Sequence, residues 1–276
     1  RFLPKWCAKY EEEMLADFKL EVAGLTISSC GASALQQKLA AMLLRFRMIS
    51  DPREYMRFMT WGRRGANLIF EATPDYAMLD RKAYSAMASM APDVRLLFLI
   101  RNPADRFWSA LRFNKTHRPD FDIDAMFHKL IDREDFRLLA DYGRTIAEAK
   151  AALGPDRLHV EFFERLFTVE AIRKICEFAG LDFVAPDFAA RSNASISAAM
   201  PPDLRLKAIK SYERSYREVA ELLPEQLPEN WRSDLGLLPE PSRSNPLEVP
   251  RGDFLKPVPD VADRANLPGR KIEKRF

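Results

Sequence analysis

Cysteine and histidine are scarce in this chain. Its 276 residues include three cysteines, Cys7, Cys30 and Cys176, and three histidines. The cysteines stand at unrelated spacings without a C-x-x-C pair, which argues against a disulfide framework and against a thiolate zinc site. With so few histidines, an imidazole metal centre is not indicated either. We therefore expect no metal ion at the functional site.

Long apolar runs and a strong excess of one charge are missing as well. No apolar run approaches the roughly 18 residues of a membrane span, although the chain starts at Arg1 and an upstream signal or anchor stays open. Forty-three basic residues against 40 acidic ones leave a net charge of +3. That mild excess suits an anionic small ligand and gives no indication of nucleic-acid binding. The alanine- and arginine-rich composition suggests a bacterial, cytoplasmic protein.

Strand and helix patterns alternate along most of the chain. The near-continuous apolar run at 94–100 predicts a strand buried on both faces, in the interior of a parallel sheet. Strands of the same sheet are predicted at 67–71 and 157–161. Helices are predicted at 32–48, 80–93, 135–153 and 168–180, and from Pro103. This order predicts an α/β domain with a parallel sheet flanked by helices.

The composition changes near Pro239. Residues 239–276 are rich in proline and polar residues, which is typical of an irregular tail rather than of a second domain. We therefore predict one domain over 1–238, followed by this tail.

The junction after the 94–100 strand carries the first candidate site residues. Arg101 follows the strand, Pro103 suits the first turn of a helix, and Ser109 lies about two helical turns further on. Ligands of parallel sheets bind beyond the carboxyl ends of the strands. An arginine fork, a hydroxyl and a helix N-terminus suit a phosphate group. The alternative is that Arg101 only caps the strand and Ser109 only packs.

Four segments resemble motifs of the sulfotransferase family, in the family's order. "FLIRNPADRFWSALRF" resembles its 3′-phosphate-binding segment, and "FEATPDYAML" its E-x-TP-x-Y segment. "RLHVEFFERLF" is similar to its strand with an acidic E-x-L turn, and "NWRSDLGL" to its C-terminal end. The resemblance implies a P-loop-like fold and sulfuryl transfer from 3′-phosphoadenosine 5′-phosphosulfate (PAPS) to a hydroxyl or amine, without a metal. It also implies that Arg101 and Ser109 hold the 3′-phosphate.

Two family motifs are not found intact. The K-x-G-T-T loop that cradles the 5′-phosphosulfate has only the degenerate "ISSCGASALQQKLA" at 27–40 as a candidate, and this stretch also suits a simple helix start. "RFLPKW" resembles the end of the family's K-E-x-x-[FY] segment, whose glutamate is often the base. We therefore expect the N-terminal strand and phosphate loop to be missing, no catalytic residue to be assignable, and sulfate transfer to be poor.

The remaining candidates have two interpretations each. Arg191 and Asn193 lie where relatives place a loop over the cofactor, or the loop caps the helix after Pro202. Glu71 either faces the site or stabilises a turn. We expect Glu164 to cap the next helix.

Several functions stay in competition. The leading hypothesis is a PAPS-dependent sulfotransferase acting on a small-molecule or carbohydrate acceptor. A non-catalytic sulfotransferase-like binding module is the alternative. A P-loop kinase is disfavoured because the chain has no G-x-x-x-x-G-K-[ST] motif. His128 and His159, in apolar surroundings, are predicted to pack rather than to react.

Overall fold

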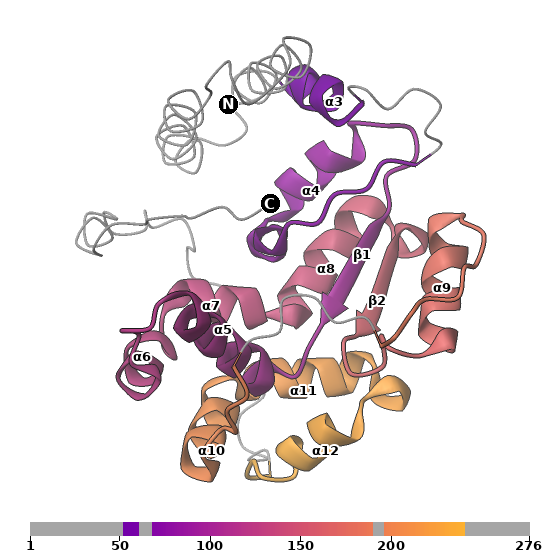
Figure 1. Ribbon diagram of the computed structural model, residues 1–276. Helices are drawn as coiled ribbons and strands as arrows, with labels where there is room; N and C mark the ends of the chain where they lie inside the picture. Colours follow the sequence, from indigo (N-terminus) through magenta and orange to yellow (C-terminus); the bar gives the residue numbers. More distant parts are fainter. Residues whose placement is uncertain (1–51, 61–67, 190–195, 241–276) are drawn as a thin grey trace, which may run out of the picture. The chain divides into compact units, whose positions relative to one another are not determined.

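The structure is a computed structural model that describes residues 52–60, 68–189 and 196–240 (Figure 1). Helices and two strands alternate through the middle of the described chain, and helices form its end. The elements are α3 Pro52–Thr60, α4 Arg81–Ala88, β1 Leu96–Ile100, α5 Pro103–His117, α6 Ile123–Leu130, α7 Glu134–Ala140, α8 Tyr142–Leu153, β2 Leu158–Phe162, α9 Val169–Ala179, α10 Pro202–Ser211, α11 Glu213–Leu222 and α12 Glu229–Leu235, with short 3-10 turns at Pro74–Met78, Pro155–Arg157 and Pro224–Gln226.

The sheet of the described chain is the parallel pair β1 and β2. Leu96 lies opposite Leu158 and Ile100 opposite Phe162, and the Phe163 N–H extends the ladder to the Ile100 carbonyl at 2.7 Å. This confirms the predicted parallel pairing. The intervening α5 to α8 supply the long crossover that parallel strands require.

The predicted strand at 67–71 is not seen. Residues 68–73 form no β-ladder and lead into a 3-10 turn, Pro74–Met78. The reason is local, because the Glu71 carboxylate accepts hydrogen bonds from Thr73 and Tyr76, both at 2.8 Å, and folds the segment back on itself.

The interior position expected for β1 is not observed in the described residues either. There β1 pairs with β2 alone, and Leu99 is 43% exposed. The apolar run does match the predicted contacts on both faces, because α8 and α9 flank the sheet on opposite sides (Figure 1). Phe98 packs edge-on against Tyr142 of α8 at 5.8 Å, and His159 packs against Phe178 of α9 at 5.3 Å.

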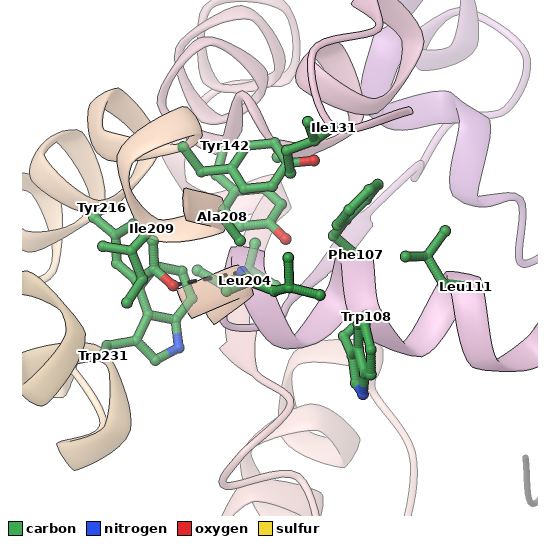
Figure 2. Packing of buried hydrophobic residues seen from close by; sticks show 14 of the residues in the cluster. Phe107, Trp108, Leu111, Ile131, Tyr142, Leu204, Ala208, Ile209, Tyr216 and Trp231 are labelled. Carbon is green, nitrogen blue, oxygen red and sulfur yellow. Dashed lines mark hydrogen bonds between the residues drawn. The ribbon is translucent and has the colours of Figure 1, made fainter. Parts of the chain in front are cut away.

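The main core lies at the carboxyl ends of the strands, where α5, α11 and α12 gather (Figure 1). Trp231 is fully buried, with its ring centroid 5.4 Å from Phe162 and 5.5 Å from Tyr216. Figure 2 shows Tyr216 and Trp231 side by side in this cluster. Tyr212 and Tyr216 are both buried in this core.

Capping residues set the helix boundaries. Asn102 caps α5 by accepting the Asp105 N–H at 3.2 Å, and Pro103 is the first helical residue, as predicted. The helix predicted at 135–153 is two helices, because Asp141 leaves helical geometry and caps α8 through the Arg144 N–H. Gly180 ends α9 with a φ of 69°, in the left-handed region that favours glycine.

Several predicted features lie outside the described residues. These are the 32–48 helix, the "ISSCGAS" stretch, Arg191, Asn193 and the tail beyond residue 240. Leu238 is buried in the core, and the domain boundary after it stays a prediction. No helix in the described ranges has both the length and the apolar character needed to cross a membrane.

Candidate functional site

Arg101 follows the carboxyl end of β1, and contacts hold both its side chain and its main chain. Its guanidinium lies over the Phe163 ring, with the central carbon 4.6 Å from the ring centroid. Its main-chain carbonyl accepts the Tyr142 hydroxyl at 2.8 Å, and burial raises the pKa of that hydroxyl, so it stays a donor. Within the described chain, no carboxylate pairs with Arg101 and no acceptor takes its N–H groups. Arg101 is thus a half-buried cation with its donors available.

Ser109 lies within α5 and is half-buried. Its hydroxyl forms no hydrogen bond with the part of the chain that the structure describes. A rise of about 1.5 Å per residue places its Cα roughly 9 Å along the helix from Pro103. That Arg101 and Ser109 face the same ligand stays a prediction.

Residues 196–198 lie against α5. The Trp108 indole N–H donates to the Ala198 carbonyl at 2.8 Å, and the Ile196 N–H donates to the Thr116 hydroxyl at 3.1 Å. The placement of Arg191 and Asn193 at the cofactor stays a prediction.

The N-terminus of α5 does not offer free amides to an anion. Pro103 has no N–H, and the Asp105 N–H donates to the Asn102 side chain at 3.2 Å. The Ala104 N–H donates to the Tyr216 hydroxyl at 3.4 Å. The predicted contribution of this helix end is therefore limited to the field of its dipole. A phosphate here must be held by side chains.

Glu164 joins the two loops that follow the strands. Its Oε1 accepts the Asn102 backbone N–H at 2.8 Å, whereas its Oε2 is buried without a hydrogen-bond partner in the described chain. The prediction that Glu164 caps α9 is wrong, because Thr168 performs that role by accepting the Ala171 N–H at 3.2 Å. Glu164 instead fixes the turn that carries Arg101.

Glu71 stabilises a turn. Its carboxylate accepts hydrogen bonds from Thr73 and Tyr76 within the E-x-TP-x-Y segment, and from Tyr55 of α3. Three donors occupy its lone pairs, which fits the structural role rather than that of a free base.

The histidines do not form a reactive cluster. His159 is half-buried against Phe178, as predicted, and burial lowers its pKa. The prediction that His128 packs in the core is wrong. It is exposed on α6, 3.0 Å from the Lys207 ammonium, while the neighbouring Phe127 fills the core position. In the described ranges, no group of three His, Cys, Asp or Glu side chains is arranged to hold a metal ion.

Sequence reasoning missed three residues that support this site. Phe163 stacks on Arg101, and Asp234 and Arg205 contact the start of α5. Phe163 and Asp234 belong to the family-like segments "RLHVEFFERLF" and "NWRSDLGL", but nothing local to these segments indicates which side chains reach the Arg101 turn.

Comparison with known proteins supplies a fold assignment. No family model matches the sequence, and no curated protein sequence matches it. A crystal structure of a sulfotransferase from Alicyclobacillus acidocaldarius matches with a TM-score of 0.54 at 25% sequence identity. The match covers 66% of this chain and 74% of that one. The chain has a sulfotransferase fold, a mostly helical α/β architecture around a small parallel sheet.

Proposed function

We propose that this protein is a PAPS-dependent sulfotransferase that moves a sulfuryl group to a hydroxyl or amine of a small acceptor. The observation that carries the proposal is Arg101. In a sulfotransferase fold, this half-buried cation without a carboxylate partner in the described chain stands beyond the end of β1. Nucleotides bind at this edge of parallel sheets.

The described side chains fit the 3′-phosphate of PAPS. The guanidinium of Arg101 can donate two parallel charge-assisted hydrogen bonds to phosphate oxygens, and Ser109 can donate a third. Adenosine nucleotides without a 3′-phosphate would leave Arg101 unpaired, so the same pair would provide selectivity for PAPS. PAPS, when bound, supplies the activated sulfuryl group, and the chain's own contribution at these residues is binding and orientation.

A non-catalytic binding module is the second candidate, and one observation favours it. The two carboxylates of the family-like motifs, Glu71 and Glu164, accept hydrogen bonds from the protein itself. The described residues therefore offer Arg101 and Ser109 for the nucleotide without offering an assigned base. Both candidates require the same nucleotide site, but only the enzyme transfers a sulfuryl group to an acceptor.

The test compares Arg101→Ala with Arg95→Ala. Arg95 lies just before the opposite end of β1 and pairs with Asp93 at 2.9 Å. Both variants remove one arginine, so they change the net charge equally. Loss of a charged hydrogen bond costs about 1.5–3 kcal/mol, or roughly 10- to 150-fold in affinity. Adenosine 3′,5′-bisphosphate should bind Arg101→Ala that much more weakly and bind Arg95→Ala like wild type.

A sulfate-transfer assay from PAPS to a phenol separates the two candidates. Transfer that falls in Arg101→Ala and persists in Arg95→Ala supports the enzyme. Bisphosphate binding without any transfer supports the binding module. Equal losses in the two variants would reduce the site to unspecific charge attraction and contradict the proposal.

A further inference from the structure

A buried carboxylate connects the C-terminal helices to the Arg101 turn. Asp234 lies near the end of α12 and is 3% exposed. Its Oδ2 accepts the Asn102 side-chain amide at 2.7 Å and the Tyr216 hydroxyl at 3.0 Å. Asn102 directly follows Arg101 and is fully buried. Asp234 therefore reaches across 132 residues of sequence to the residue beside the candidate phosphate ligand.

Arg205 of α10 adds a second connection. Its Nε and Nη2 form a bidentate pair with Asp234 at 3.0 and 2.7 Å. Its Nη1 donates to Asp105, in the first turn of α5, at 2.8 Å. Together, α10, α11 and α12 contribute Arg205, Tyr216 and Asp234 to the start of α5.

The network fixes both ends of the Asn102 amide. Its Nδ2 donates to Asp234, and its Oδ1 accepts from the Asp105 N–H at 3.2 Å and lies 2.8 Å from the Tyr216 hydroxyl, whose one proton is shared between this oxygen and Asp234 Oδ2. An amide held at nitrogen and oxygen has one orientation, and its backbone follows. The preceding Arg101 carbonyl is held by Tyr142.

Stability alone does not account well for such a cluster. Buried ion pairs contribute little net stability compared with apolar side chains of the same volume, because desolvation of the charges offsets their attraction. Hydrogen bonds of fixed direction also hold the bonded side chains in one orientation. The hydrogen bonds of this cluster meet at Asn102, next to Arg101.

We propose that Asp234 is a positioning residue of the nucleotide site: it holds Asn102 and so orients Arg101 toward the 3′-phosphate. This inference rests on the proposed function. It assigns the "NWRSDLGL" segment, which otherwise only ends the domain, to the binding of the nucleotide. It also makes the helices α10 to α12 part of that site.

The experiment measures how much the 3′-phosphate contributes to binding. The measured quantity is the ratio of the dissociation constant of adenosine 5′-monophosphate to that of adenosine 3′,5′-bisphosphate, on the full chain. Asp234→Asn places an amide nitrogen or a neutral oxygen against Asn102, and should lower this ratio about fivefold, the size of one net hydrogen bond. Affinity for the monophosphate should change less than twofold.

The exchange variant provides the rescue. Asn102→Asp alone puts two carboxylates in contact and should also lower the ratio. Asn102→Asp combined with Asp234→Asn restores one charge and one amide, so the ratio should return to within about twofold of wild type, a strong coupling in a double-mutant cycle. Aspartate also serves as an N-cap for α5.

Thr145→Val is the matched control. Thr145 is equally buried and donates to the Ala77 carbonyl at 2.7 Å, and in the described chain it forms no hydrogen bond with Arg101, Asn102 or Asp234. It should lower the melting temperature and leave the ratio unchanged. If Asp234→Asn does not fold, Tyr216→Phe, which removes only the hydroxyl, should lower the ratio about twofold.

The outcomes are distinguishable. A wild-type ratio near one contradicts the proposed function, and the role of Asp234 with it. A high wild-type ratio that survives in folded Asp234→Asn, or in Tyr216→Phe where that variant is needed, overturns the role of Asp234 and leaves the proposed function standing. If the exchange variant did not restore the ratio, that result would also contradict the role of Asp234.

Discussion

Replacing Phe163 by leucine should weaken nucleotide binding by releasing Arg101. The Phe163 ring lies 4.6 Å from the Arg101 guanidinium carbon, and both residues are half-buried. Cation–π contacts stabilise by about 0.5–1 kcal/mol when exposed and about 2 kcal/mol when desolvated. For a half-buried pair we take about 1 kcal/mol, which is roughly fivefold in the dissociation constant. The released guanidinium must then be ordered by the ligand, at a cost in rotamer entropy.

Calorimetric titration with adenosine 3′,5′-bisphosphate measures this effect. Phe163→Leu should bind about fivefold more weakly, while Phe163→Tyr keeps an aromatic face and should bind like wild type. Phe167→Leu is the control, because Phe167 packs edge-on against Phe163 at 5.3 Å but is 59% exposed and does not face Arg101 in a cation–π contact. Unchanged affinity in Phe163→Leu would refute the reasoning, as would an equal loss in Phe163→Tyr.

Three further predictions concern the fold around the site. Burial lowers the pKa of His159 in the folded chain, so the unfolded chain protonates this imidazole first as the pH falls. The free energy of unfolding should therefore decrease below about pH 6.5. Urea titrations at pH 5 and 7 should show a smaller decrease for His159→Gln. Gly143→Ala would place a Cβ 2.9 Å from the Glu218 Cβ; it should cost about 1–3 kcal/mol by calorimetric melting, and Gly236→Ala, which has room, should not. Glu71→Ala should cost about 1 kcal/mol and leave bisphosphate affinity within twofold; a larger loss of affinity would place Glu71 in the site.

The β1–α5 junction could be predicted because its signals are local. An apolar run, then Asn102 and Pro103, specify a strand end, a cap and a first helical turn within a few residues. The end of α9 at Gly180 follows from the same kind of signal. Parallel pairing of β1 with β2 followed from the helices between them.

Features that depend on which particular side chains form hydrogen bonds could not be predicted. The 67–71 stretch has strand composition, yet residues 68–71 form no ladder and lead into the Pro74–Met78 turn, where Glu71 accepts hydrogen bonds from Thr73 and Tyr76. Asp141 divides one helical pattern into two because its side chain caps α8. The contact between Asn102 and Asp234 joins residues that no sequence pattern relates. The elements of the site were therefore accessible from sequence, whereas its supporting network was not.

The central claim is that Arg101 binds the 3′-phosphate of the nucleotide. The most direct measurement is the affinity of the wild-type chain for adenosine 3′,5′-bisphosphate beside adenosine 5′-monophosphate, at one salt concentration. One charged hydrogen bond of about 1.5–3 kcal/mol predicts that the bisphosphate binds at least about tenfold more tightly. Equal affinities for the two nucleotides would contradict the account.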